Sequence, residues 1–175
     1  MAYYYLISSL PMLKSDGDMP LSYEQFLSAC RDSVKDDKYQ MLKELSLSSS
    51  EGPLLSEWAK FYGVLTDELT YQRNIRLGRG AKAPEQKDES VSKLIASALN
   101  NKNPLEAEKM LLGLEFERLD ELIGTHYFDD YALLGYALKL KLLERRKIFD
   151  KERGKNELHR IVGNLEQQIV SMEQE

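Results

Sequence analysis

Apolar residues recur three or four positions apart along most of this chain, which is the spacing of one face of an α-helix. From residue 130 the same pattern continues to residue 172, a helical span of roughly 65 Å at 1.5 Å per residue. The pattern predicts an all-α fold, a helical bundle with a long C-terminal helix. The shorter helices are predicted over residues 23–34, 36–47, 53–77, 89–99 and 104–123.

Helix-start and helix-stop signals support these elements. Ser22 and Gln25 have the spacing of a capping box, and Asn103, followed by a proline, suits an N-cap. Gly78, with Gly80 after it, is expected to end the helix that starts at residue 53.

Three expectations concern burial. Cys30 lies on an apolar helical stripe, so we expect a small core residue rather than a reactive thiol. Ile75 and Leu77 belong to the apolar face of the helix predicted from residue 53, and Leu105 to that of the next long helix; all three are expected to be buried. The aromatic and aliphatic cluster at residues 3–7 is expected to pack against a later part of the chain, as a helix or a short strand.

Residues 82–88 (KAPEQKD) are the best candidate for a domain boundary. They divide the chain into an N-terminal helical region, residues 1–81, and a C-terminal region, residues 89–175, with one continuous domain as the alternative. Gly154 suits a kink in the long helix. Beyond it an apolar seam repeats at heptad spacing, and packing of this seam on the body or on a partner helix both stay open. The seam residues are Leu158, Val162, Leu165, Ile169 and Met172.

Composition narrows the function classes. The net charge of −5 argues against a general nucleic-acid binder, and a single cysteine excludes an internal disulfide. The first ten residues lack the features of a secretory signal, and no apolar run reaches the length of a membrane span. We expect a cytoplasmic protein that meets a membrane only through its partners.

Charge is unevenly distributed. Residues 71–87 carry five basic residues and one acidic residue, a local charge of +4. Cations at a helix C-terminus are the ordinary explanation for Arg73, Arg76 and Arg79, and an acidic protein partner or an anion site is the functional one. Further on, residues 106–130 carry a net −6, whereas residues 139–153, which include Arg145 and Arg146, carry +4. This change of sign suggests internal pairing or two docking faces.

No reaction chemistry stands out. His126 with Asp129 and Asp130 could be interpreted as a metal site, but acidic residues are expected before the helix that begins there, and the other histidine, His159, is distant. The chain shows no catalytic triad order, nucleotide loop, zinc spacing or cofactor fingerprint. We therefore expect no enzyme activity, no cofactor and no metal.

Two blocks carry a family resemblance: residues 3–11 (YYYLISSLP) and residues 103–154, from NPLEAEKMLL to DKERG. They resemble an uncharacterised bacterial family encoded among the subunits of V-type (A-type) ATPases. More distantly, they resemble the C/d rotor protein of these ATPases, which is named d in eukaryotes. The resemblance implies an all-helical fold that corresponds to one part of the C/d fold. It also implies a non-catalytic role in a proton- or sodium-translocating ATPase, coupling the central stalk to the membrane rotor ring.

The leading hypothesis is thus a structural or accessory subunit of a V-type ATPase, with proteins of the central stalk or the rotor ring as partners. The alternatives are an independent helical adaptor or assembly chaperone, and a binder of nucleic acid or small anions that would also use Lys82. The candidate partner-binding residues are Arg73, Arg76, Arg79, Arg145, Arg146, Leu158, Val162, Leu165 and Ile169.

Overall fold

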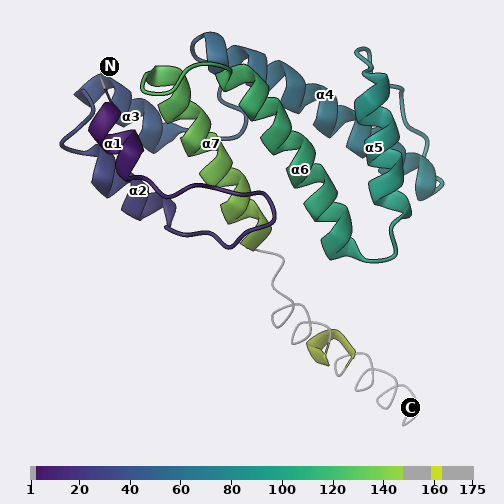
Figure 1. The fold of residues 1–175 in the computed structure, drawn as a ribbon. Helices are drawn as coiled ribbons and strands as arrows, with labels where there is room; N and C mark the ends of the chain where they lie inside the picture. Colours follow the sequence, from purple (N-terminus) through teal and green to yellow (C-terminus); the bar gives the residue numbers. More distant parts are fainter. Residues whose placement is uncertain (1–2, 148–158, 163–175) are drawn as a thin grey trace, which may run out of the picture. The chain divides into compact units, whose positions relative to one another are not determined.

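The computed structural model describes residues 3–147 and 159–162 (Figure 1). These residues are helical and contain no strand, which confirms the all-α prediction. The cluster at the start of the chain is a helix rather than a strand. The helices are α1 (Tyr4–Ser9), α2 (Tyr23–Cys30), α3 (Asp36–Glu44), α4 (Pro53–Arg76), α5 (Glu89–Asn100), α6 (Pro104–Ile123) and α7 (Asp130–Lys147).

Residues 1–144 form one compact unit, and residues 145–175 form a second. The helix predicted over residues 130–172 begins as α7, whose described part ends at Lys147. Outside the described residues lie Gly154, Leu158, Leu165 and Ile169. The length of the C-terminal helix therefore stays a prediction.

The predicted caps are present. Ser22 Oγ accepts the backbone N–H of Gln25 at 3.2 Å, and Gln25 Oε1 accepts that of Ser22 at 2.8 Å, which completes the capping box of α2. Asn103 Oδ1 accepts the N–H of Leu105 at the start of α6. Just beyond the end of α4, Gly78 has a φ of +67°, a conformation that side-chain-bearing residues rarely adopt. Local sequence thus places these helix ends.

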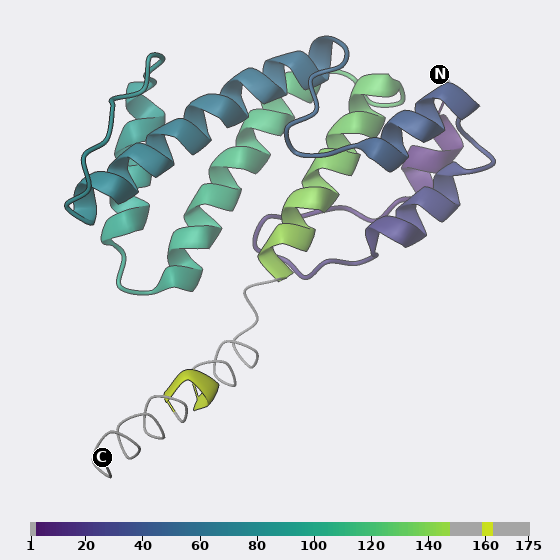
Figure 2. The same cartoon turned by 180° about the vertical axis from the view of Figure 1, so that it is seen from behind.

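The main core surrounds α7, which lies between α6 and the group formed by α1, α2 and α3 in both views (Figures 1 and 2). Leu138, Leu140 and Leu142 on α7 are fully buried, so this helix buries more than one face. Phe26 from α2 and Trp58 from α4 complete this core.

A second cluster joins α4, α5 and α6. It consists of Leu65 from α4, Val91, Ile95 and Ala98 from α5, and Leu111 from α6. Residues on both sides of the predicted linker, 82–88, therefore pack in one core, and this linker lies within the compact unit of residues 1–144.

Burial confirms the expectation for Cys30, confirms it only in part for the N-terminal cluster, where Tyr3 and Leu6 are buried but Tyr5 is exposed, and contradicts it for three other apolar residues. Cys30 is fully buried, and burial raises the pKa of its thiol to about 12, which agrees with a core role. Ile75, Leu77 and Leu105, however, are exposed. The last buried residue of α4 is Glu68, so the final two turns of this helix carry their apolar face beyond the core. Leu105 lies in the first turn of α6, before Leu111, the first buried residue of that helix, so it too lies beyond the core.

Three tyrosines make stability sensitive to alkaline pH. Burial is the main cause that raises the pKa of Tyr3 and of Tyr136 to about 12 each, and it raises the pKa of Tyr23 further. Below pH 10 these phenols are neutral in both the folded and the unfolded chain. Between about pH 10 and 12 the unfolded chain ionises first, so stability should fall as pH rises. Urea titrations at several alkaline pH values should show that the urea concentration at the unfolding midpoint falls as pH rises. This fall should be shallower in the Tyr136→Phe variant, which lacks one of the three phenols. An equally steep fall in that variant would show that Tyr136 does not contribute to the pH dependence.

Candidate partner-docking surface

The C-terminal end of α4 and the residues after it combine apolar and basic side chains. Ile75 is 54% exposed and Leu77 is 64% exposed, and Arg73, Arg76 and Arg79 are exposed beside them in sequence. Arg73 and Arg76 lie in the last helical turn, where the helix dipole favours cations. We refer to these five residues as the basic–apolar surface.

The three arginines are not used inside the described part of the chain. None of them forms an ion pair there, whereas the nearby Lys82 lies 3.2 Å from Glu85. Their charges are therefore available to an external group. The helix dipole accounts for their position, but it does not neutralise them or cover the neighbouring apolar side chains.

A pocket of about 280 Å³ adjoins this surface, between α4 and α5. It shares Ile75 and Arg76 with the basic–apolar surface, and Leu99 and Ala96 contribute apolar area from α5. Its volume is large enough to receive an apolar side chain. The residues lining it are Tyr71, Gln72, Ile75, Arg76, Ala96, Leu99 and Asn100.

A buried polar group lies one turn before this pocket on α4. Glu68 is 2% exposed, and its Oε2 has no hydrogen-bond partner among the described residues. Gln72 Nε2 donates to Glu68 Oε1 at 2.6 Å and to the carbonyl of Ser92 at 3.1 Å. These bonds hold Gln72, which lines the pocket, against α5.

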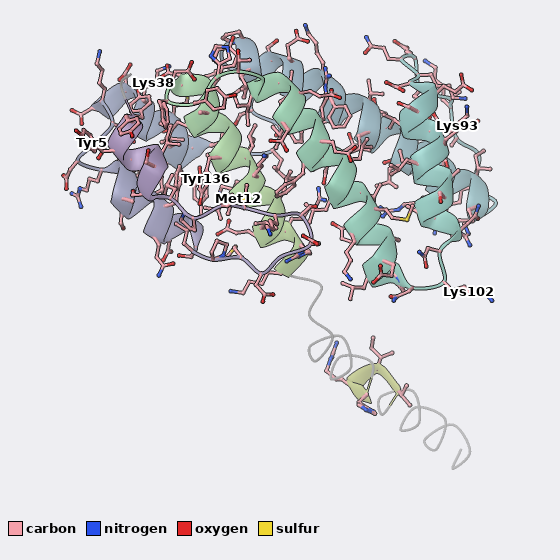
Figure 3. The ribbon with its side chains drawn as sticks, in the orientation of Figure 1. Tyr5, Met12, Lys38, Lys93, Lys102 and Tyr136 are labelled. Atoms are coloured by element: carbon pink, nitrogen blue, oxygen red, sulfur yellow. The ribbon has the colours of Figure 1, made fainter. Side chains whose placement is uncertain are left out.

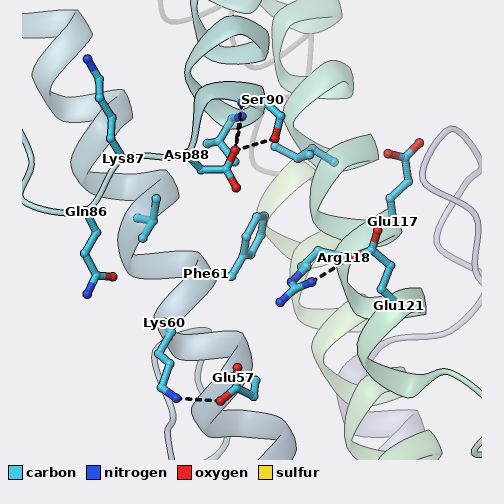
Figure 4. A pocket seen from close by; sticks show the side chains of 13 residues that line it. Glu57, Lys60, Phe61, Gln86, Lys87, Asp88, Ser90, Glu117, Arg118 and Glu121 are labelled. Carbon is cyan, nitrogen blue, oxygen red and sulfur yellow. Dashed lines mark hydrogen bonds and ion pairs between the residues drawn. The ribbon is translucent and has the colours of Figure 1, made fainter.

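A separate groove of about 410 Å³ lies where α4, the start of α5 and α6 meet (Figure 4). Phe61 contributes an aromatic ring, and the Arg118 guanidinium lies 5.8 Å from its centroid. Lys60 pairs with Glu57 at 2.6 Å, and Arg118 pairs with Glu121 at 2.8 Å. The charges in this groove thus largely neutralise one another, unlike those of the basic–apolar surface.

Asp88 borders the same groove and caps α5. Its Oδ1 accepts from Ser90 Oγ at 2.6 Å and from the backbone N–H groups of Ser90 and Val91. The hydrogen bond from the Ser90 side chain is the main cause that lowers the pKa of Asp88, followed by the bond from the Val91 backbone. This carboxylate therefore serves as the N-cap of α5.

The carboxylates beside His126 have partners within the fold. Asp129 Oδ1 accepts the backbone N–H groups of Tyr131 and Ala132, so this carboxylate caps α7, while its Oδ2 contacts His126 Nδ1. Partial burial opposes ionisation of Asp129, but these hydrogen bonds outweigh it and lower its pKa. Asp130 pairs with Lys38 at 2.9 Å. Across residues 3–147 and 159–162 no three His, Cys, Asp or Glu residues gather as metal ligands would.

The other predicted partner-binding residues are distributed differently. Arg145 and Arg146 are half-buried in the last turn of α7, and Val162 is exposed. The remaining seam residues lie outside the described part of the chain. The sequence analysis did not predict that α5 contributes to the pocket beside the basic–apolar surface. The apolar face of α5, which continues to Leu99 near the end of this helix, was the feature that could have indicated it.

The fold defines the class: an all-α protein, with no helix in its described part long and apolar enough to cross a membrane. Residues 88–169 match the family described as "protein of unknown function" (DUF2764). This match begins at the cap of α5 and includes α6 and α7, but not the basic–apolar surface. The comparison with curated proteins and the comparison with solved structures returned no match.

Proposed function

We propose that this chain is a non-catalytic structural or accessory subunit of a V-type ATPase, and that it binds another protein of the assembly through the basic–apolar surface. The observation that carries the binding role is the presence of three arginines without ion pairs in the described part of the chain, beside exposed Ile75 and Leu77. The assembly itself comes from the resemblance of residues 3–11 and 103–154 to the family encoded with these ATPases.

The basic–apolar surface suits a partner that carries acidic residues and one exposed apolar side chain that can enter the adjoining pocket. Burial of Ile75 and Leu77 would provide affinity, at about 25 cal/mol for each Å² of apolar area removed from water. The arginines would steer an acidic surface towards this contact and set its orientation, since charge complementarity acts mainly on association rate and specificity. An amphipathic acidic helix that places one apolar side chain in the adjoining pocket satisfies both requirements.

The packing of the core suits a rigid subunit that transmits force between its partners. In residues 1–144, α7 is buried on more than one face, and the second cluster fixes α4 and α5 to α6. Close packing of this kind resists deformation, so a force applied at the end of α4 would move the whole unit. In the proposed complex this rigid unit couples the central stalk to the rotor ring, and the chain reaches the membrane only through its partners.

We predict that the triple variant Arg73→Gln/Arg76→Gln/Arg79→Gln loses co-purification with the stalk and rotor ring proteins, with affinity lowered on the order of tenfold or more. The reason is that the variant keeps the apolar contact but removes the charges that attract an acidic partner. Binding by the unmodified chain should also weaken as salt is raised. Purified stalk and ring proteins, mixed with this chain and analysed by size-exclusion chromatography and calorimetry, provide the measurement.

The matched control is Lys14→Gln/Lys35→Gln/Lys43→Gln, which changes the net charge equally at exposed positions elsewhere. It should bind as the unmodified chain does. If the unmodified chain bound no protein of the ATPase, and the ATPase assembled normally in its absence, the proposed assembly would be wrong. Arginine-dependent binding to a different helical protein would instead identify an adaptor or an assembly chaperone.

A further inference from the structure

The pocket between α4 and α5 places a guanidinium and apolar side chains in one small cavity. Arg76 lines it together with Ile75 from α4 and with Ala96 and Leu99 from α5. At about 280 Å³ it lies just below the usual size of small-molecule sites, roughly 300–1,000 Å³, so it suits a single side chain. One residue of a ligand can therefore meet both the apolar wall and the charge.

The charge in this pocket is available to an external group. Within the described part of the chain, the Arg76 guanidinium has no ion pair, and no acidic residue lines the pocket. The buried Glu68, two turns earlier on α4, accepts a hydrogen bond from Gln72 through its Oε1. Lys102, exposed two residues after Asn100 and labelled in Figure 3, adds positive charge beyond the end of α5.

Two helix ends oppose an anion here, but the full charges outweigh them. α4 ends at Arg76 and α5 at Asn100, and each helix C-terminus carries roughly half a negative elementary charge. In the last turn of α4, three carbonyls already accept the backbone N–H groups of residues 77–79. Against about one negative charge in total stand the positive charges of Arg73, Arg76 and Arg79. This end of the unit therefore attracts an anionic group.

We propose that the pocket binds the C-terminal residue of the partner protein, with its apolar side chain in the cavity and its α-carboxylate on Arg76. In a C-terminal residue both groups are attached to the same carbon atom, which suits a cavity that Arg76 itself lines. An internal apolar residue has no charge on its main chain, and the acidic neighbours on its helical face lie a full turn away. A guanidinium binds a carboxylate through two parallel hydrogen bonds, and capture of a terminal carboxylate is a recurring mode of peptide recognition.

This proposal rests on the proposed function, because it specifies which part of the acidic partner enters the basic–apolar surface. A partner helix that ends in the pocket would also turn the negative end of its dipole towards the arginines. The two proposals can fail separately. An acidic partner that binds through internal residues would keep the proposed function and exclude the C-terminal anchor.

The test uses the full chain and a labelled acidic peptide that ends in leucine, as the free acid and as the C-terminal amide. Fluorescence anisotropy should show binding of the free acid, with the amide about tenfold or more weaker, because the amide lacks the charge that Arg76 binds. The same peptide extended by glycine and serine should also bind about tenfold more weakly, since its carboxylate no longer lies beside the leucine side chain. Affinity of the amide or of the extended peptide equal to that of the free acid would overturn the proposal.

Substitution of Arg76 tests the contact with the carboxylate. Arg76→Gln should weaken binding of the free acid about tenfold but that of the amide less than about threefold, because the amide has no carboxylate to lose. The control is Lys14→Gln, the same change of charge at an exposed position elsewhere, which should bind as the unmodified chain does. Equal losses for the two peptides in Arg76→Gln would overturn the proposal.

Substitution of Ala96 tests the cavity. Ala96→Leu fills the pocket and should weaken binding of the free acid about fivefold or more. Ser97→Leu, exposed on the same helix and outside the pocket, should not. Circular dichroism and the melting temperature verify the folding of each variant. Unchanged affinity in Ala96→Leu would show that leucine does not enter the pocket and would overturn the proposal.

The small acid N-acetyl-leucine separates a protein terminus from a free carboxylic acid. It should displace the peptide only at concentrations about a hundredfold higher, because it lacks the acidic residues that the other arginines attract. Displacement at equal concentration would assign the pocket to a small carboxylic acid and overturn the proposal. Absence of binding by every peptide would also overturn it, whereas binding of the whole stalk and rotor ring proteins decides the proposed function separately.

Discussion

Replacing Trp58 by alanine should lower the free energy of unfolding by about 3–5 kcal/mol, the range for removal of a large aromatic side chain from a core. Trp58 is fully buried on α4, and its ring stacks on Tyr62 with centroids 5.6 Å apart. Its Nε1 donates to the carbonyl of Leu47 at 2.9 Å, which fastens the segment after α3 to α4. Since ordinary domains are stable by about 5–15 kcal/mol, this change would remove a large share of the total.

Urea unfolding followed by far-UV circular dichroism provides the measurement, because Trp58 is the only tryptophan and the variant has no tryptophan fluorescence. The control is Trp58→Phe, which keeps an aromatic ring but leaves the carbonyl of Leu47 without its donor. It should cost about 1–3 kcal/mol, from the smaller ring and the loss of one part-buried hydrogen bond. A loss below about 1 kcal/mol in the alanine variant would contradict the central position of Trp58 in this core.

Much of the fold could be predicted from local sequence because helix ends depend on nearby residues. The Ser22 capping box and the Asn103 cap need only side chains and backbone groups within three residues, and both are present as predicted. Burial depends on what another helix covers, which periodicity along one helix does not contain. Ile75 and Leu77 continue the apolar stripe of α4, yet they are exposed because this stripe extends beyond the second core cluster.

The candidate site shows the same division. The local charge around Arg73, Arg76 and Arg79 was visible in the sequence, since it needs only a count of residues. The adjoining pocket was not, because its walls come from α4 and α5, whose pairing is a tertiary contact. The rings of Tyr4 and Phe128, with centroids 4.7 Å apart, come from distant parts of the chain, and no motif signals that contact.

Replacing Gly135 by alanine should destabilise the protein by about 1–3 kcal/mol, the usual cost of overpacking a core. Gly135 lies on α7 where α6 approaches closely. A Cβ placed there would lie 2.5 Å from Ile123 Cγ1 and closer still to Ile123 Cδ1, whereas real Cβ atoms essentially never come within 3.0 Å. Because Cγ1 is attached to Cβ, rotation of only the far end of Ile123 does not relieve the contact, so Ile123 must change its χ1 rotamer or α6 and α7 must move apart.

The matched control is Gly113→Ala on α6, where a Cβ would meet nothing within 4 Å. Here alanine should stabilise the protein by about 0.5–1 kcal/mol, because it restricts the unfolded chain and suits a helix interior. The same chemical change should thus have opposite signs at two helical glycines. A double-mutant cycle tests the cause directly, because Ile123→Ala removes the clashing atoms. In the Ile123→Ala background, the loss of stability caused by Gly135→Ala should be smaller by about 1 kcal/mol or more. Equal costs in the two backgrounds would show that Ile123 is not what requires glycine at this position.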